Sequence, residues 1–418
     1  MEDDNDSLGA SVLFEASSQE LDPTIQTYGQ WLDESPMLYD FLMVHSLEFK
    51  SNTIEWVKGA TTQKRHQYSV NSLYFSTNAP QGEQNFIYQL GIQIPFSEAE
   101  VDLSYFTEEG NQKHSSGRID GKVTTCSRIN HDGVVYQLRY CPSCSQCVIA
   151  SGANGAINLF DLRKLPSSPI DIYMHPENTF LGQSSTCHGL DWSVVTDGRV
   201  AAGSDDGKVC VWDALGNSQQ PIVEYRAHQQ AISSVCWHPS DASTLFSGGM
   251  DGHVYMYDCR TNTQSPVIQR DGAIHTVSAH PVERFLLATA GDENTVCLWD
   301  NRNLARPIHS LVGHSGVVTE VEWNPLNCSC LATCGRDKRV CIWDLGRIGA
   351  SIATEEGPPE LVFVHGGHTS FVNGIAWSPN TPWMIASTGE DSLLQIWKPA
   401  EPIYMDLDVY EKGQGVRL

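Results

Sequence analysis

Positive charge and long apolar runs are both scarce in this sequence, and each shortage removes a class of function. Lys and Arg number 26 against 50 Asp and Glu, so the formal net charge is −24 at pH 7. A surface of this kind repels the phosphates of nucleic acids and attracts basic proteins, which predicts protein partners and no direct nucleic-acid contact. No run of eighteen apolar residues occurs, so we expect no segment that spans a membrane.

Paired cysteines and a secretory signal are also missing from the pattern. The thirteen cysteines are an odd number and fall in strand-like segments, which argues against a disulfide framework. The first residues, MEDDNDSLGASVLFEASSQE, are acidic and lack the basic-then-apolar order of a secretory signal. Both features predict a protein that works where thiols stay reduced.

Signatures of catalysis are absent as well. The sequence contains no phosphate-cradling Gly loop, no nucleophile elbow and no His-Glu-x-x-His helix. The spacing Cys141-Pro-Ser-Cys144-Ser-Gln-Cys147 resembles half of a metal site, but no clear fourth ligand lies nearby in the sequence. We predict no catalytic residue, no metal and no cofactor, and therefore a protein that is not an enzyme.

What the sequence does contain is an internal repeat of six units. Each unit ends in an aromatic residue followed by a polar or charged one, and a turn residue lies six positions before the aromatic. The terminal pairs are Phe160-Asp161, Trp212-Asp213, Tyr257-Asp258, Trp299-Asp300, Trp343-Asp344 and Trp397-Lys398. Thirty residues before the second member of each pair lies a histidine or its replacement: His131, Gln183, His228, Arg270, His314 and His368. Self-similarity at a fixed spacing is the signature of a repeat architecture.

Each unit reads as short strands separated by Gly and Asp turns, without a helical period. The His, Asp and Trp-Asp positions match the WD repeat, in which one unit makes one four-stranded blade of a propeller. The resemblance implies that these side chains hydrogen-bond to one another inside the blade, and that the units with Gln183 and Arg270 have weaker networks. The repeat histidines and aspartates are therefore expected to be framework rather than catalytic.

A seventh blade is needed to close the ring, and residues 46–95 with the segment after residue 121 supply it. Three strands are expected at Thr53–Val57, Tyr68–Phe75 and Asn85–Ile94, and a fourth at Lys122–Ile129. Pairing of the two ends of the chain then removes free sheet edges. The predicted fold class is all-β, a seven-bladed WD-repeat β-propeller with an N-terminal α-helix packed on its side.

Segments outside the repeat set the expected domain limits. Asp22-Pro23 is a helix start, and apolar residues after it share one helical face. The expected organisation is an acidic disordered tail at 1–21, a helix at 22–45, the propeller at 46–398 with inserts at 96–121 and 348–362, and a C-terminal tail at 399–418.

Three stretches carry a more specific resemblance. They are Tyr28-x-x-Trp31 through Pro36-Met-Leu-Tyr-Asp-Phe-Leu-Met-Val-His-Ser-Leu-Glu48, Arg128-Ile-Asn-His-Asp-Gly133 and Gly357-Pro-Pro-Glu-Leu-Val-Phe-Val-His-Gly-Gly-His368. These stretches resemble the retinoblastoma-binding histone chaperone family of WD-repeat proteins, which includes the small subunit of chromatin assembly factor 1. The resemblance implies a monomeric scaffold that binds core histones, as H3–H4, within chromatin-assembly, deacetylase or Polycomb-type complexes. It implies a nuclear protein and leaves a cytoplasmic pool open.

In that family a helix of histone H4 lies in a groove between the N-terminal helix and the Pro-Pro loop. An amphipathic basic helix needs an apolar floor for its anchors and carboxylates at the rim for its Lys and Arg side chains. The matching positions, and thus the predicted groove, are Trp31, Met37, Leu38, Phe41, Glu355, Glu356, Pro358, Pro359, Phe363 and Val364.

The family also binds basic peptides at the top of the propeller, where acidic residues hold the arginine of a histone H3 tail. The third and fifth residues after each repeat histidine point to that entrance, and none of the twelve is a carboxylate here. We therefore expect the basic-tail site to be replaced by a neutral, aromatic and histidine-bearing surface for a less basic peptide, or to be lost altogether. The residues of this surface are Tyr136, His188, His275 and Phe371, with Glu390 nearby.

An alternative function rests on three arginines. Phe160-Asp-Leu-Arg163, Tyr257-Asp-Cys-Arg260 and Trp299-Asp-Asn-Arg302 resemble the Trp-Asp-x-Arg signature of substrate receptors for cullin-based ubiquitin ligases. The signature is common among WD proteins. A ligase receptor therefore remains the second hypothesis, and the two functions do not exclude each other.

Overall fold

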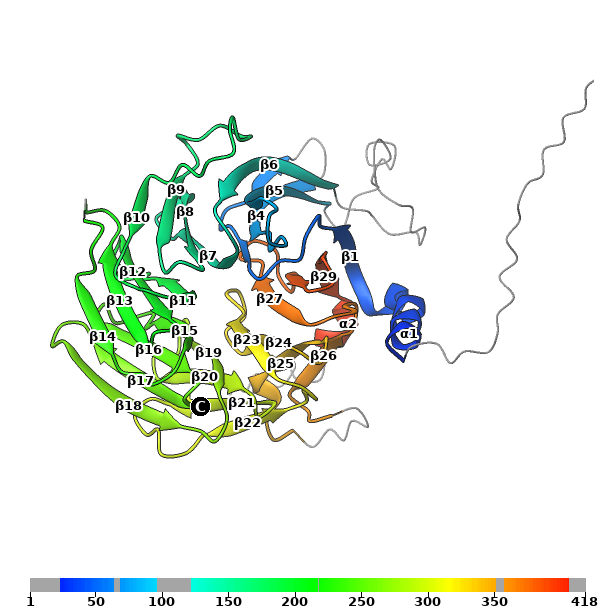
Figure 1. Ribbon diagram of the computed structural model, residues 1–418. Helices are drawn as coiled ribbons and strands as arrows, with labels where there is room; N and C mark the ends of the chain where they lie inside the picture. Colours follow the sequence, from blue (N-terminus) through cyan, green and yellow to red (C-terminus); the bar gives the residue numbers. More distant parts are fainter. Residues whose placement is uncertain (1–22, 64–67, 96–121, 217, 351–356, 406–418) are drawn as a thin grey trace, which may run out of the picture.

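Seven antiparallel sheets stand around a central axis in the computed structural model, which describes residues 23–63, 68–95, 122–216, 218–350 and 357–405 (Figure 1). Each sheet is one blade, so the predicted seven-bladed propeller with an N-terminal helix is confirmed. None of the helices in these ranges has the length and apolar character needed to cross a bilayer. The predicted tail at 1–21, most of the tail at 399–418 and the insert at 96–121 lie outside the described residues.

Blades 2 to 6 each contain four strands that are consecutive in the chain. Blade 2 has β7 (Val135–Cys141), β8 (Cys144–Gly152), β9 (Ile157–Asp161) and β10 (Asn178–Phe180). Blade 3 has β11 (Cys187–Trp192), β12 (Arg199–Ser204), β13 (Lys208–Asp213) and β14 (Val223–Arg226). Blade 4 has β15 (Ile232–Trp237), β16 (Thr244–Gly249), β17 (His253–Asp258) and β18 (Thr263–Gln269). Blade 5 has β19 (Ile274–Ala279), β20 (Leu286–Gly291), β21 (Thr295–Asp300) and β22 (His309–Val312), and blade 6 has β23 (Val318–Trp323), β24 (Cys330–Gly335), β25 (Val340–Asp344) and β26 (Leu361–His365).

Blades 1 and 7 are built from the two ends of the repeat region. Blade 1 has β2 (Ile54–Trp56), β4 (Tyr68–Ser76), β5 (Asn85–Pro95) and β6 (Lys122–His131), with β3 (Thr61–Gln63) beside β4. These are the four strands expected from the sequence. Blade 7 has β27 (Val372–Trp377), β28 (Ile385–Gly389), β29 (Leu393–Pro399) and, as its outer strand, β1 (Tyr39–Ser46). The helices are α1 (Pro23–Leu38) and α2 (Glu401–Tyr404), with a 3-10 turn η3 at Leu345–Arg347.

The predicted helix at 22–45 is wrong in its second half, because residues 39–46 form strand β1. In this strand Tyr39, Phe41 and Met43 are buried while Asp40 and Val44 are exposed, which is the two-residue period of a strand. The run is also rich in aromatic and branched residues that favour strands. β1 pairs antiparallel with β29, so the N-terminal segment closes the ring and belongs to the propeller.

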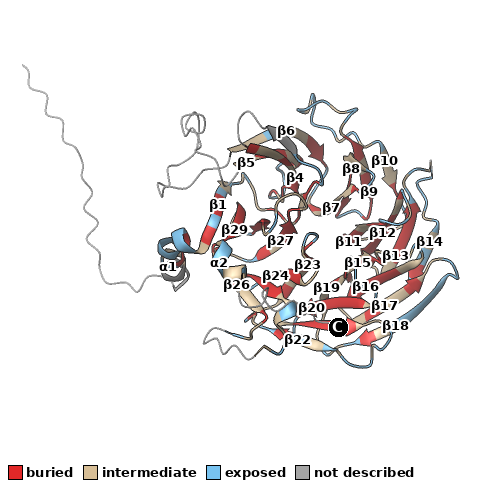
Figure 2. Cartoon of the chain, turned by 180° about the vertical axis from the view of Figure 1, so that it is seen from behind, coloured by how far each residue is buried: buried red, intermediate tan, exposed pale blue. Residues whose placement is uncertain are grey.

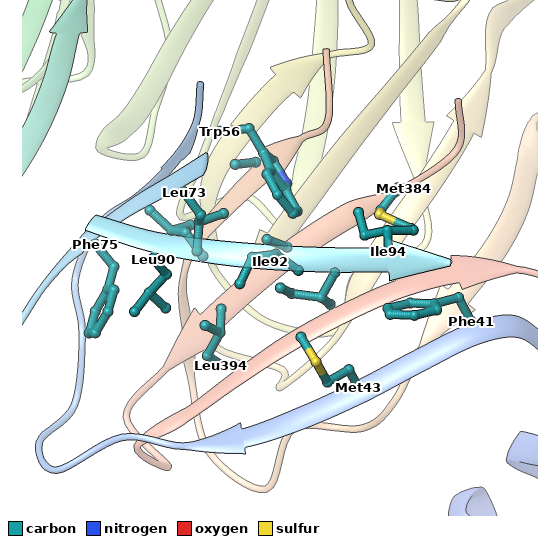
Figure 3. Packing of buried hydrophobic residues seen from close by; sticks show 14 residues of the cluster. Phe41, Met43, Trp56, Leu73, Phe75, Leu90, Ile92, Ile94, Met384 and Leu394 are labelled. Atoms are coloured by element: carbon teal, nitrogen blue, oxygen red, sulfur yellow. The ribbon is translucent and has the colours of Figure 1, made fainter. Parts of the chain in front are cut away.

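The core lies between neighbouring blades, and the junction of blades 7 and 1 shows how the ring is closed (Figure 3). Phe41 and Met43 of β1 pack there with Leu394 of β29 and with Trp56 and Ile92 of blade 1. Burial runs along the inner strands of every blade, whereas the loops and much of α1 are exposed (Figure 2). Closure therefore rests on apolar packing as well as on strand pairing.

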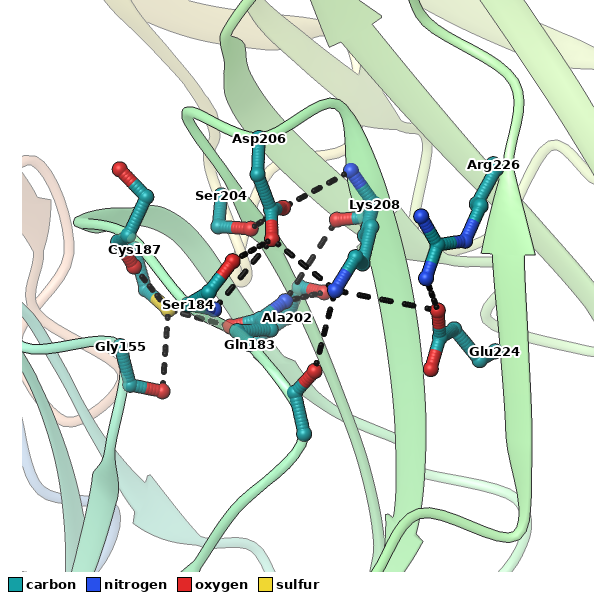
Figure 4. Close-up of polar contacts among 12 residues, drawn as sticks. Gly155, Gln183, Ser184, Cys187, Ala202, Ser204, Asp206, Lys208, Glu224 and Arg226 are labelled. Carbon is teal, nitrogen blue, oxygen red and sulfur yellow. Dashed lines mark hydrogen bonds and ion pairs between the residues drawn. The ribbon is translucent and has the colours of Figure 1, made fainter.

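Polar networks inside the blades follow the repeat where it is intact. In blade 6, His314 contacts Asp337 at 2.8 Å and Thr333 at 2.7 Å, and Trp343 Nε1 donates to the same threonine at 2.9 Å. In blade 3, Gln183 Nε2 instead donates to the carbonyl of Ala202 at 2.7 Å (Figure 4). Trp212 Nε1 donates to the carbonyl of Leu181 at 2.9 Å rather than to a side chain shared with Gln183.

In blade 5 the substitution by Arg270 has a similar effect. Its guanidinium pairs with Glu293 and contacts Thr295 at 3.1 Å, while its buried Nη1 has no hydrogen-bond partner among the described residues. Trp299 Nε1 still donates to Thr289 at 2.9 Å, so blade 5 keeps the tryptophan end of its network. Each replacement removes the histidine contacts in one of the two blades where the sequence predicted a weaker network.

Candidate functional site

Helix α1 is held against the propeller by Trp31, whose side chain is only 7% exposed. The indole Nε1 donates to Tyr39 Oη at 2.9 Å. The ring also occupies the space that a side chain at Gly367 would need, since the nearest tryptophan atom is 2.7 Å from a Cβ built there. Trp31 was predicted to contact a ligand in the groove, but its burial makes it an anchor of the helix instead.

A buried relay continues from this anchor into blade 7. Tyr39 Oη contacts His365 Nδ1 at 2.7 Å, and His365 Nε2 contacts Gln395 Oε1 at 3.1 Å. The imidazole of His365 also stacks on Trp397, with ring centroids 4.3 Å apart. Burial lowers the pKa of His365 well below its usual range, and the neighbouring His368 lowers it further, so the imidazole is neutral.

The variant Tyr39→Phe is expected to loosen α1, because Trp31 Nε1 and His365 Nδ1 each lose their partner. A buried polar group left unsatisfied costs about 1–3 kcal/mol. The rate of limited proteolysis within α1 and the thermal midpoint should both report the loss. Tyr173→Phe, at a ring that is 67% exposed, serves as the control. Equal cleavage rates in the two variants would contradict the anchoring role of Tyr39.

The predicted groove residues divide into an exposed set and a buried set. Met37 is 78% exposed, and Leu38 is half-buried on the same core cluster as Phe363. Phe363 itself is 7% exposed, and Phe41 is 8% exposed in the junction of blades 7 and 1, so both are core residues rather than contact residues. The half-buried groove residues beyond β25 are Pro358, Pro359 and Val364.

Carboxylates at the groove rim were predicted at Glu355 and Glu356, which lie outside the described residues. Two further acids, Asp33 and Glu34, were not predicted as rim residues and are exposed on α1. They precede Met37 by four and three residues, spacings at which helical side chains are neighbours. Their helical spacing from Met37 was visible in the sequence and would have predicted them as rim residues.

The candidate groove therefore lies on the side of the propeller where α1 meets blades 6 and 7. Trp31 of α1, Phe363 of β26 and Trp397 of β29 share one buried cluster, against which Leu38 and Ile403 also pack. α2, which carries Ile403, lies beside β26 (Figure 1). This packing brings α1 and α2 onto the same side of the ring.

At the top of the propeller, one residue in each of six inner strands is a β-bulge. Bulges re-aim a side chain out of the regular ladder, and here the bulged residues line a central channel of about 500 Å³. The residues are Tyr136, His188, Ser233, His275, Thr319 and Asn373.

Three of the predicted top-face residues thus share the channel, and two do not. The rings of Tyr136 and His188 meet edge to face with centroids 4.8 Å apart. Both channel histidines carry a carboxylate partner, which makes the entrance less neutral than predicted: His188 lies 3.2 Å from Asp205, and His275 lies 2.8 Å from Asp292. Phe371, 39% exposed, and Glu390, which lies 3.8 Å from Lys50, are not in the channel lining.

Deeper in the channel lies a cluster of four carboxylates around Arg139 that was not predicted from the sequence. One oxygen of each carboxylate accepts a backbone N–H from the inner strand of another blade, at 2.7 to 2.9 Å. The inner strand of a blade is an edge strand, so these N–H groups need side-chain acceptors. The four carboxylates are Glu55, Asp191, Glu320 and Glu322.

Burial dominates the electrostatics of this channel cluster. It raises the pKa of Glu55 to about 8 and that of Asp191 to about 6, although the charge of Arg139 opposes both shifts. Glu320 Oε1 lies 3.6 Å from Arg139 Nη2. The predicted top face covered only the third and fifth residues after each repeat histidine, whereas the acids of blades 3 and 6 lie at the sixth or eighth. These acids were predictable from the alternation of side chains along the inner strand after the bulge, which points every second residue into the channel.

The three arginines of the ligase hypothesis are all engaged by their own blades. Each pairs with the aspartate two residues before it, at 2.6 to 3.2 Å, and each side chain stays 61% to 74% exposed. This contact orders the arginine without identifying a partner, so the ligase hypothesis stays a prediction. The pairs are Arg163 with Asp161, Arg260 with Asp258, and Arg302 with Asp300.

Comparison with models of known families gives three matches along the chain. Residues 26–96 match the family described as histone-binding protein RBBP4 or a subunit of the CAF1 complex. Residues 174–213 match the WD domain, G-beta repeat, and residues 214–395 match the WD40 repeat of MIOS. The first match covers most of α1, the closing strand β1 and most of blade 1, and the other two cover blades 3 to 7.

Proposed function

Because the chain belongs to the WD-repeat family of histone-binding protein RBBP4 and its counterpart in the CAF1 complex, we propose that it is a histone-binding scaffold with no catalytic activity of its own. The observation that carries the proposal is the match over residues 26–96, because that segment includes most of α1 and the strand that ties it to blade 7. The surplus of 50 acidic over 26 basic side chains suits a basic partner.

The proposed ligand of the groove is an amphipathic basic helix of histone H4. Met37 and the half-buried Leu38 offer apolar contacts for anchors spaced along one face of the helix, whereas Val364 packs toward the core between blades 5 and 6. Asp33 and Glu34 supply carboxylates at the edge, where ion pairs contribute about 0–1 kcal/mol each and mainly speed association. Glu355 and Glu356, outside the described residues, are proposed as further rim carboxylates.

We also propose that the protein serves as one copy within larger nuclear complexes that assemble or modify chromatin, with H3–H4 as the histone partner. A rigid ring with separate side and top surfaces is able to hold two ligands at once. For the top face we propose a peptide less basic than a histone tail, since His188 and His275 already pair with acids and Arg139 already offsets the channel carboxylates.

Fluorescence anisotropy with two labelled peptides, the first helix of H4 and the H3 tail, tests the groove at moderate salt. Met37→Asp is expected to weaken the affinity for the H4 peptide by about ten- to 150-fold. This is the equivalent of about 1.5–3 kcal/mol of lost apolar burial. Leu38→Asp and Glu355→Lys/Glu356→Lys should also weaken it. The control is Val282→Asp, at a 63% exposed site in blade 5.

Two outcomes decide whether the proposed function holds. Binding of the H4 peptide that only the groove variants reduce supports the chaperone function. An H4 peptide that does not bind the wild-type protein overturns it. Tight binding of the unmodified H3 tail, lost on changing Tyr136 or Phe371, would instead contradict the proposed change at the top face.

A further inference from the structure

The loop between β9 and β10 projects at the rim of the ring, away from the groove and the top face (Figure 1). This loop, residues 162–177, folds against the outer strand of blade 1. Arg128 N donates to Ser167 O at 2.9 Å, and Asn130 Nδ2 donates to the carbonyl of Asp171 at 2.6 Å and of Tyr173 at 3.2 Å. Asn130 is only 5% exposed, so buried hydrogen bonds hold the loop in place.

Although the loop is anchored, it presents large apolar side chains to solvent. Ile170 is 88% exposed, Ile172 is 73% exposed and Tyr173 is 67% exposed. Single exposed apolar residues are ordinary on protein surfaces, but a contiguous group of them marks an interaction site. These three lie within four residues on a fixed backbone, which reduces the entropy lost when a partner binds.

A pocket of about 150 Å³ opens beside these side chains, between the loop and blade 1. That volume is the size of an apolar cavity that accepts one aromatic ring. Its walls are mostly apolar. The pocket is lined by Arg128, Ile129, Asn130, Leu165, Pro166, Pro169, Ile170, Asp171, Tyr173 and His175.

Arg128 and Asp171 are the charged lining residues of the pocket, and the carboxylate of Asp171 contacts His175 Nε2 at 3.0 Å. The guanidinium of Arg128 lies 4.6 Å from the centre of the Phe86 ring, and no carboxylate within the described ranges pairs with it. The other basic side chains of the loop each have an acidic partner: Arg163 with Asp161, Lys164 with Glu177, and His175 with Asp171. In a chain of formal charge −24, an arginine without an acidic partner at an apolar pocket is complementary to a carboxylate ligand.

We infer that this pocket binds a short segment of a partner protein in which one large apolar side chain stands next to an Asp or Glu. The apolar side chain enters the pocket between Pro169 and Ile129. The adjacent carboxylate accepts hydrogen bonds from the guanidinium of Arg128, and Ile172 and Tyr173 cover the flanking residues. Such a ligand is acidic, whereas histone segments are basic, so this surface is independent of the proposed groove.

A phage-displayed library of random twelve-residue peptides, selected on the full chain, tests the inference. Counter-selection uses Ile170→Asp, which adds charge at an 88% exposed site and should leave the fold intact. We expect enriched peptides to share an apolar residue beside Asp or Glu. A synthetic peptide of that consensus should lose about tenfold in affinity on Arg128→Gln and on Ile170→Asp. The H4 peptide should bind both variants as it binds the wild type.

Three results would overturn the inference. The first is that the enriched peptides bind Ile170→Asp as well as they bind the wild type. The second is a consensus without acidic residues. The third is a consensus peptide that binds Arg128→Gln as tightly as it binds the wild type. Unchanged melting temperatures of the two variants exclude loss of folding as the cause of weaker binding. Because the H4 peptide is measured on the same samples, failure of the pocket is distinguished from failure of the groove.

Discussion

Replacing Arg139 by methionine is expected to destabilise the propeller strongly at pH 8 and much less at pH 5.5. The substitution leaves Glu55, Asp191, Glu320 and Glu322 in the channel without the cation that lies among them. Removing one partner of a buried ion pair costs about 3–5 kcal/mol. We expect the lower end of that range, since 23% of the Arg139 side chain and 21% of the Glu320 side chain are exposed to the channel.

The pH dependence follows from the direction of the carboxylate pKa shifts. Burial raises the folded-state pKa of Asp191 to about 6 and of Glu55 to about 8, above their values in an unfolded chain. A group of this kind contributes most stability below its ordinary pKa and loses it as the pH rises through the folded value. The difference in thermal midpoint between Arg139→Met and wild type should therefore widen from pH 5.5 to pH 8.

Two companion variants make the Arg139 test specific. Arg139→Lys keeps the charge and should be milder at pH 8. Adding Glu322→Gln to Arg139→Met removes one carboxylate charge while keeping an oxygen for the N–H of Trp377, so it should restore part of the lost stability. A deficit of the same size at both pH values would mean that packing, and not charge, explains the effect of Arg139.

Gly291→Ala is the second change with a large expected effect. Gly291 ends β20 opposite Ile274, next to the bulge at His275, and a Cβ there would overlap the carbonyl oxygen of Ala273. The three nearest atoms all belong to the backbone of Ala273 and His275, so no flexible side chain is able to move out of the way. Overpacking of this kind costs about 1–3 kcal/mol, and we expect the upper end of that range.

Gly152→Ala is the matched control for Gly291→Ala, because Gly152 holds the same position in blade 2, opposite Val135. The nearest atoms to a Cβ there are side-chain atoms of Asn154 and His131 at 3.4 Å. Urea or thermal midpoints of the two variants should differ clearly, with Gly152→Ala close to wild type. Similar midpoints would show that the crowding at Gly291 relaxes without cost.

The sequence predicted the fold well and the binding surfaces only in part. The repeat spacing identified six blades, and apolar alternation located the four strands of blade 1. The same alternation misled at residues 39–46, where an apolar pattern was assigned to the end of a helix although it forms strand β1. A short apolar run next to a helix suits either element, and here pairing with β29 decides.

Of the predicted groove positions, Trp31, Phe41 and Phe363 are buried, whereas Met37 is exposed. A large apolar residue suits both a core position and a ligand contact, so the residue type alone does not tell which of the two it is. The partners that bury these rings come from both ends of the chain. Tyr39 meets His365 across 326 positions of sequence, and no local pattern reveals such a contact.

By itself the sequence determined the number and order of the blades, the residues of their internal networks and the acidic character of the surface. The blades and their networks depend on hydrogen bonds and side-chain alternation among residues close in the chain, so they produce a repeating sequence pattern. The acidic character follows from composition alone. Only the tertiary structure decided that strand β1 closes the ring and that four carboxylates from blades 1, 3 and 6 surround Arg139 of blade 2. The same is true of the pocket where Arg128 meets the loop at 162–177. Each of these depends on how separate blades pack around a common axis, and packing across blades leaves no period in the sequence.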